Sequence, residues 1–296
     1  MPESRPTSAL ASRRGLTYWR RLAVDRLVTA ATILCSILVV APLVAIFAYL
    51  VYRGIGSINW AFLTREPAPV GEPGGGMANA IVGSAMMLAV ASAIGVPLGI
   101  GSGIYLSERG RSGFAQLVRF TADVLNGVPS IVTGIAVYAL VVVRQKHFSG
   151  LAGGIALGIM MVPTITRTTE EMLLMVPNAV REAALGLGIP RWRTTLSIVL
   201  RSATSGVITG VMLAFARVAG ETAPLLFTAL GNQFWNLKLS QPTAALPLQI
   251  YVYALSGYDD WHRQAWAGAL VLIVLIVGAV AAVRVATSRG MMRGAA

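Results

Sequence analysis

Two charged side chains interrupt an apolar run in the second half of this sequence. Arg217 and Glu221 lie four residues apart within the run 202–230, and Pro224 follows them. A charge within lipid costs at least about 2.5–3.5 kcal/mol by insertion scales, so such residues usually face a bundle interior and serve function. At a spacing of four, the two side chains share one helix face and can pair. Because Pro224 lacks a backbone donor, we expect the helix to break near Gly220.

The pair of Arg217 and Glu221 has the chemistry of an oxyanion site. A guanidinium stays charged and presents a planar fork that matches the oxygens of a tetrahedral anion such as phosphate. Glu221 could accept a hydrogen bond from a protonated phosphate oxygen, which sulfate lacks at neutral pH. It could equally neutralise Arg217 while the site is empty. The alternative is an ion pair that only stabilises helix packing.

The composition of the chain is that of a membrane protein. Of its 296 residues, 55% are hydrophobic and 12% are charged, and the mean hydropathy is +0.69. Soluble domains carry about 25% charged residues. A helix needs roughly 20 apolar residues to cross a bilayer. Six runs of about this length predict six transmembrane helices, at 27–52, 78–106, 115–143, 151–175, 202–230 and 264–286.

The net charge of +12 is distributed as in a protein that spans a membrane. Arg and Lys gather at the ends of the apolar runs and form no stripe with interleaved aromatics, which argues against a nucleic-acid partner. With the N-terminus inside, 17 of the 24 Arg and Lys residues fall on the inner side and six on the outer side. This predicts cytoplasmic tails at 1–26 and 288–296 and an extracytoplasmic loop at 53–77. The segment 177–201 then faces the cytoplasm too.

That cytoplasmic segment, 177–201, is too polar to span a membrane and carries the signals of a short helix. Asn178 has the side chain of an N-cap, Gly188 fits the C′ position, and Pro190 prevents continuation. We therefore predict a helix over 179–187 that lies along the membrane face.

Aromatic residues and prolines give two further expectations. The segment 231–263 contains Trp235 and Trp261, which suit a membrane–water interface. Prolines within the apolar runs are expected to kink the spans. They are Pro42, Pro97, Pro129 and Pro163.

Residues 182–188 resemble the EAA loop of bacterial ABC-importer permeases. They read Glu-Ala-Ala-Leu-Gly-Leu-Gly, Ile-Val-Leu follows at 198–200, and Arg201 stands where that family usually has proline. The resemblance implies that the short helix docks into a groove of a separate ATPase subunit. The alternative is an interfacial helix that binds only lipid headgroups.

The resemblance also implies roles for four residues of this loop. Small side chains at Ala183 and Ala184 would allow close approach to the ATPase, Glu182 would offer it a charge, and Gly188 would end the helix. The chain has no Gly-Lys-Ser/Thr of a Walker A loop, since its two lysines follow Gln and Leu. We therefore expect a non-catalytic membrane subunit whose ATPase is another chain.

The run 217–230 closely resembles the PstA-type permeases of the phosphate-specific transport system. Its string Gly-Glu-Thr-Ala-Pro-Leu-Leu-Phe-Thr at 220–228 is specific to that group, and the resemblance covers about 78–287. The further matches lie at 123–132, 162–170, 177–187 and 232–235.

This second resemblance implies that Arg217 and Arg167 take part in phosphate passage, and the pairing geometry adds Glu221. For Arg167, an arginine that faces lipid headgroups near the inner surface is an equal alternative. Asp123 is interpreted as structural, in a cap or a pair near the inner end of the third span.

The architecture that the resemblance implies is all-α, with the type I ABC-importer permease fold over 78–287. The implied partners are a PstC-type permease as heterodimer, a dimer of PstB-type ATPases on the cytoplasmic side and a PstS-type phosphate-binding protein outside. The implied location is the bacterial inner membrane. Phosphate would enter the cytoplasm by alternating access, as ATP binding moves the helix 179–187.

Two other functions compete with this interpretation. A permease of the same fold could carry sulfate or molybdate, although the string at 220–228 disfavours it. An intramembrane protease or lipid transferase would need paired carboxylates or a Ser–His pair, whereas Glu221 is the one carboxylate expected at membrane depth. His147 and His262 stand alone, so neither a metal site nor a cofactor is expected.

Overall fold

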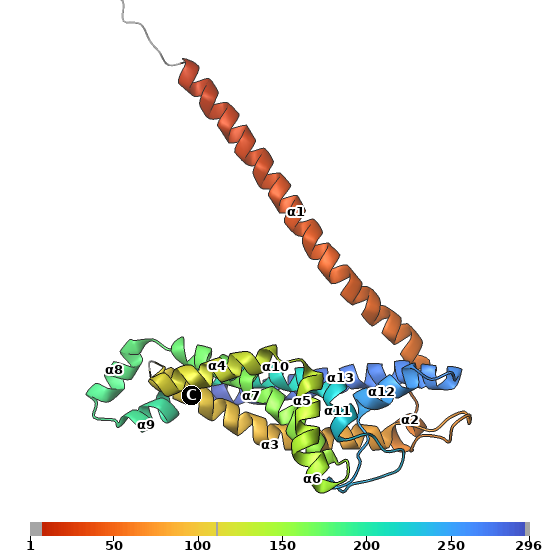
Figure 1. The fold of residues 1–296 in the computed structure, drawn as a ribbon. Coiled ribbons are helices and arrows are strands. Elements are labelled where there is room, and N and C mark those ends of the chain that lie inside the picture. The colour runs from red at the N-terminus through yellow and green to blue at the C-terminus, as the bar shows by residue number, and fades with distance from the viewer. Residues whose placement is uncertain (1–7, 111, 294–296) are drawn as a thin grey trace, which may run out of the picture. The chain divides into compact units, whose positions relative to one another are not determined.

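The protein is built from helices (Figure 1). The structure is a computed structural model that describes residues 8–110 and 112–293. Over these residues there is no strand, and β-type pairing is limited to two isolated bridges. The predicted all-α class is confirmed. The ends of the two predicted tails, residues 1–7 and 294–296, lie outside the described residues.

Contacts divide the chain into two units, and the first unit is formed by one helix. This unit comprises residues 1–52, and its helix α1 (Ser8–Gly54) continues through Pro42. The segment Tyr18–Ser57 is long and apolar enough to cross a membrane and contains the predicted span 27–52. The helix begins well before that span, because Ala, Leu and Arg, all good helix formers, dominate its first turns.

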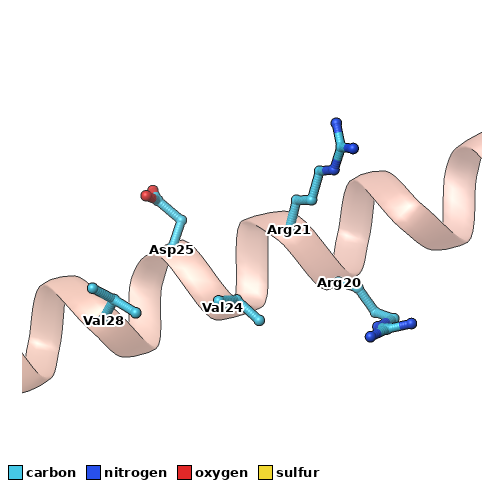
Figure 2. Close-up of a pocket in the computed structure, with 5 residues that line it drawn as sticks. All are labelled: Arg20, Arg21, Val24, Asp25 and Val28. Carbon is cyan, nitrogen blue, oxygen red and sulfur yellow. The ribbon is translucent and has the colours of Figure 1, made fainter.

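Three charged residues before the first span, Arg20, Arg21 and Asp25, project from α1 (Figure 2). Figure 2 shows Arg20, Arg21 and Asp25 together with Val24 and Val28 on this helix. Since all five side chains belong to one helix, they form a charged turn and no enclosed site. Arginines at this position suit the anionic surface of a membrane.

The second unit comprises residues 53–296 and contains the other helices. Over the described chain, five helices are long and apolar enough to cross a membrane, or six if one bent pair is a single span. In Figure 1, α8 and α9 lie at one end of this unit and α2 and α12 at the other. Its helices are η1 (Ile55–Ser57), α2 (Trp60–Thr64), α3 (Ala78–Arg109), α4 (Gly113–Gly127), α5 (Ser130–Val137), η2 (Tyr138–Val142), α6 (Val143–Gln145), α7 (Gly150–Leu174), α8 (Asn178–Gly186), α9 (Arg191–Arg193), η3 (Thr194–Val199), α10 (Leu200–Ala219), α11 (Ala223–Thr228), α12 (Leu246–Ala254) and α13 (Asp259–Arg293).

The central helix of this unit is α7, most of which is buried. Helix α3 approaches it through glycines at a spacing of four, namely Gly95, Gly99 and Gly103. A Cβ atom at Gly99 would lie 2.6 Å from the Cβ atom of Ile165, and one at Gly95 would lie 2.7 Å from that of Met161. Small residues at such spacing let helix backbones approach closely in lipid. The pair α3–α7 is therefore packed without room for larger side chains.

The third apolar run forms a bent pair and not a straight span. Helices α4 and α5 meet at 106°. Pro129 supplies no backbone donor and holds Val128 in an extended conformation, so the helix must stop there. Pro97 and Pro163 behave differently, because α3 and α7 continue through them.

The segment 231–263 was expected at a membrane–water interface, but part of it lies in the core. It contains α12, whose Leu246 and Tyr253 are fully buried. Trp261 is also buried and stacks on Tyr253 with ring centroids 4.3 Å apart. Burial raises the pKa of the Tyr253 phenol. Of the two tryptophans, only Trp235 is exposed, so the interface interpretation is wrong for Trp261.

The glycine contact between α3 and α7 predicts a matched pair of stability effects. Gly99→Val should push α3 away from Ile165 and lower the free energy of unfolding by about 1–3 kcal/mol. Gly101→Val makes the same change two residues away, where no atom lies within 4 Å, and should change stability only by the small helix-propensity difference, which favours Val over Gly. Thermal unfolding of the purified full-length chain in detergent compares the two variants. Equal midpoints would contradict the close packing described above.

Candidate functional site

Arg217 is an exposed side chain on α10, two residues before this helix ends at Ala219. In the part of the chain that the structure describes, no hydrogen bond or ion pair reaches its guanidinium. The predicted pair of Arg217 and Glu221 is therefore wrong, and Glu221 does not neutralise this cation. Pairing at a spacing of four requires a continuous helix, whereas Glu221 lies in a break.

That break was predicted from Pro224 and is present. The chain leaves the helical path at Gly220 and enters α11 at Ala223, with Pro224 in the first turn of the new helix. A Cβ atom at Gly134 of α5 would lie 2.6 Å from the Cα atom of Pro224, so α5 covers this point closely. The partly exposed Glu221 is thus held in irregular backbone next to two short helices.

Contacts between α10 and α7 give the depth of Arg217. Gly206 packs against Met172 and Gly210 against Thr168, so the two helices run antiparallel. Arg217 follows Gly210 by seven residues, which at 1.5 Å per residue is about 10 Å further from the α8 end. It therefore lies level with the middle of α7, which is the middle of the bundle. An unpaired cation at this depth is unusual.

Arg167, by contrast, lies in a network of four charges between α4 and α7. Its Nε lies 3.0 Å from Oδ1 of Asp123 in an ion pair, and its Nη1 donates a hydrogen bond to Oε2 of Glu170 at 2.9 Å. Arg119 binds the other oxygen of Glu170 at 2.5 Å. Two guanidinium groups and two carboxylates thus neutralise one another. Asp123, expected to be structural, is here a direct partner of a predicted site residue.

The two carboxylates of this network differ in exposure. The Glu170 side chain is only 4% exposed, whereas that of Asp123 is 52% exposed. The expectation that Glu221 is the one carboxylate at membrane depth is therefore wrong, since Glu170 is buried in α7. A buried carboxylate held by two guanidinium groups is fixed in place. Asp123 is the partner of Arg167 that another anion could replace.

Polar side chains continue along the same face of α4 and α7. Thr164 donates a hydrogen bond to Asn126 at 3.3 Å, one turn away from the pair of Arg167 and Asp123. Asparagine and threonine offer donors to an oxyanion. The sequence interpretation missed both residues. Their spacing of three from Asp123 and Arg167, within apolar helices, was the available signal.

The predicted helix of the polar loop is present as α8. Gly188 has φ +78°, the amide of Ile189 donates to the carbonyl of Ala184 at 3.1 Å, and the amide of Gly188 donates to that of Leu185 at 2.9 Å. These two bonds form a complete Schellman motif. Asn178 is not the N-cap as predicted, because Pro177 takes that position and Asn178 is the first helical residue.

The residues predicted to contact an ATPase divide between two faces of α8. Glu182, Ala183 and Gly188 are exposed. Ala184 is buried, so its small side chain faces the rest of this chain, where α8 packs on η3. Leu187, at 81% exposure, lies on the open side. Glu182, Ala183, Leu187 and Gly188 are thus the predicted or neighbouring residues that this chain leaves uncovered.

Comparison with known proteins gives the relatives of this chain. Residues 95–289 match the family described as binding-protein-dependent transport system inner membrane component. The phosphate transport system permease protein PstA of Yersinia pestis is 45% identical to this chain, over 90% of this chain and 91% of that protein. The protein of the same name from Haemophilus influenzae is 43% identical, over 88% of this chain and 92% of that protein. The PstA protein of Mycobacterium leprae is 36% identical, over 88% of this chain and 87% of that protein.

Solved structures of transporters share the fold. A chain of the MetNI methionine ABC transporter in an inward-facing conformation matches with a TM-score of 0.54 and 18% identity, over 71% of this chain and 93% of that chain. A second crystal form of it matches with a TM-score of 0.53 and 17% identity, over 81% and 97%. The predicted ABC-importer permease fold is confirmed. By these matches the chain belongs to the family of binding-protein-dependent transport system inner membrane components, as a permease subunit of the PstA type.

Proposed function

We propose that this chain lets inorganic phosphate cross the inner membrane into the cytoplasm, driven by a separate ATPase. The observation that carries the proposal is Arg217, a cation at the middle depth of the bundle without a partner in the described chain. Relatives that are 43–45% identical over about nine-tenths of the chain are named as phosphate transport permeases. The string around Arg217 is the part of the sequence most specific to that group.

The energetics of Arg217 favour an anion path. Leaving a guanidinium in hydrocarbon costs several kcal/mol, and no carboxylate of the described chain offsets that cost here. Because the side chain is exposed on α10, it must face water, an anion or a second subunit. We infer that it lines a path between this chain and a PstC-type permease. Glu221 would accept a hydrogen bond from a protonated phosphate oxygen in the same path.

The path would continue inward along α4 and α7. Arg167 lies about 9 Å nearer the α8 end than Arg217, by the helix register and rise. When phosphate reaches Arg167, it would displace the exposed Asp123 while the buried Glu170 stays in place. The return of Asp123 would then release the anion. This exchange keeps a strong cation from trapping its cargo.

The charge distribution gives the orientation. We propose that both termini and α8 are cytoplasmic, since 17 of the 24 Arg and Lys residues would then lie inside. A dimer of PstB-type ATPases would contact Glu182, Ala183 and Gly188, with Ala184 supporting α8 from within. A PstS-type binding protein would deliver phosphate at the α12 end. Alternating access about Arg217 would complete the cycle.

Arg217→Gln should leave the complex assembled and lower phosphate uptake roughly tenfold to hundredfold. This is the rate decrease expected when the transition state for transport loses one hydrogen bond from a charged group. Arg201→Gln changes the same residue type on the same helix at the α8 end, where its side chain is exposed, and should retain uptake. Labelled-phosphate uptake by the reconstituted complex measures both. Normal uptake in Arg217→Gln would refute the site, and transport of sulfate or molybdate in place of phosphate would favour the competing oxyanion function.

Asp123→Asn should slow uptake about tenfold, because Arg167 loses the carboxylate that competes with phosphate. Adding Asn126→Asp to Asp123→Asn places a carboxylate one turn along the same helix face of α4 and tests whether a nearby negative charge restores release. The measurement is the same uptake assay at saturating phosphate. If Asp123→Asn transports at the wild-type rate, Asp123 does not take part in release.

Glu182→Lys should detach or uncouple the ATPase, because the reversed charge meets the surface that the exposed Glu182 faces. Glu72→Lys makes the same change in an exposed loop of the second unit outside α8 and should leave the complex intact. Co-purification of the ATPase and ATP hydrolysis report the two effects. Equal recovery of the ATPase with both variants would contradict the proposal that α8 contacts the ATPase.

A further inference from the structure

Arg181 joins α8 to two other helices of the second unit. Its Nη1 forms an ion pair with Oε1 of Glu108, which stands in the last turn of α3. Its Nη2 donates a hydrogen bond of 3.0 Å to the carbonyl of Leu173, in the last turn of α7. One side chain thus contacts the ends of both helices of the closely packed pair.

Both contacts suit the electrostatics of helix ends. The last carbonyls of a helix lack intrahelical partners, and a cation near them is favourable. A carboxylate in the last turn of α3 is unfavourable by itself, so Glu108 gains from a cation beside it. The Arg181 side chain is 18% exposed and that of Glu108 is 30% exposed. The pair is therefore less screened than one on an open surface.

The chain path shows why this contact matters for α3. Helix α8 is linked covalently to α7 through Met175–Pro177 and to α10 through the segment that begins at Leu187. Helix α3 has no such link to α8. The ion pair with Glu108 ties α8 to α3, and the hydrogen bond to Leu173 fixes α8 against the end of α7.

We propose that Arg181 is a positioning residue that transmits movement of α8 to the pair α3–α7, through Glu108 and the Leu173 carbonyl. The proposal rests on the proposed function, in which an ATPase moves α8. Because α3 and α7 interlock through Gly95, Gly99 and Gly103, they respond as one body. Loss of Arg181 should leave α8 able to follow the ATPase without carrying the pair α3–α7 with it.

The test compares phosphate moved per ATP hydrolysed by the full reconstituted complex. Arg181→Gln and Glu108→Gln should each lower this ratio by roughly fivefold, as expected for one lost coupling contact. Arg193→Gln removes a nearby exposed arginine whose guanidinium lies 5.6 Å from the centre of the Trp192 ring, and should keep the ratio. A variant that merely folds poorly lowers both activities together and leaves the ratio unchanged.

The effect of changing Glu108 distinguishes this proposal from the alternative that Arg181 contacts the ATPase directly. If Arg181 acts by touching the ATPase, Arg181→Gln lowers the ratio and Glu108→Gln does not, which overturns the proposal. The charge exchange of Arg181→Glu with Glu108→Arg should restore part of the ratio, since the ion pair can re-form while the bond to Leu173 cannot. No recovery in the exchanged pair would also contradict it.

A second readout does not depend on the solute. In the intact complex, amide hydrogen exchange over α8 should be faster in Arg181→Gln and in Glu108→Gln and unchanged in Arg193→Gln. Unchanged exchange in the first two variants would show that the contact does not hold α8. If the wild-type complex moves no phosphate, the proposed function fails, and this exchange experiment still decides whether Arg181 ties α8 to α3.

Discussion

The close approach of α3 and α7 is the constraint on which the rest of the second unit depends. Lipid provides no hydrophobic force between helices, so they associate through van der Waals packing and need small residues at the contact. Gly95, Gly99 and Gly103 meet that need along one face of α3. This contact fixes the position of α7, and therefore the positions of the α7 side chains that pair with neighbouring helices. Its partners α4 and α10 pack on the same helix.

The charges among these helices fall into two kinds that differ in energy and in role. Arg119, Arg167, Asp123 and Glu170 neutralise one another, which offsets the cost of taking each from water. Arg217 has no such compensation within the described chain and must obtain it from outside. A paired charge explains packing, whereas an unpaired one at middle depth needs a solute, water or a second subunit. In the proposed function, phosphate therefore meets Arg217 as a free cation and Arg167 only when it displaces Asp123.

A transporter subunit must connect its solute path with the helix that its ATPase moves. In the proposed function, two helices would make that connection. Helix α7 carries Arg167 and ends where Leu173 accepts the hydrogen bond from Arg181, and α10 continues from η3, on which α8 packs, to Arg217. Because helices are rigid along their axes, a shift at the α8 end would reach the middle of the bundle without a hinge. The break at Gly220 lies just beyond Arg217, where α10 ends.

Much of this protein follows from the sequence alone, because hydropathy, prolines and glycines act locally. The lengths of the apolar runs predict the spans, and Pro224 predicts the break near Gly220. The amino-acid sequence of residues 217–230 predicts the family. Tertiary structure decided what depends on rotation and depth between helices. It brought Glu170 of α7 to Arg119 of α4, whereas the break that parts Glu221 from Arg217 is the one that Pro224 predicts. Hydropathy and spacing along a single helix do not encode such pairs, since their geometry arises only when two helices pack.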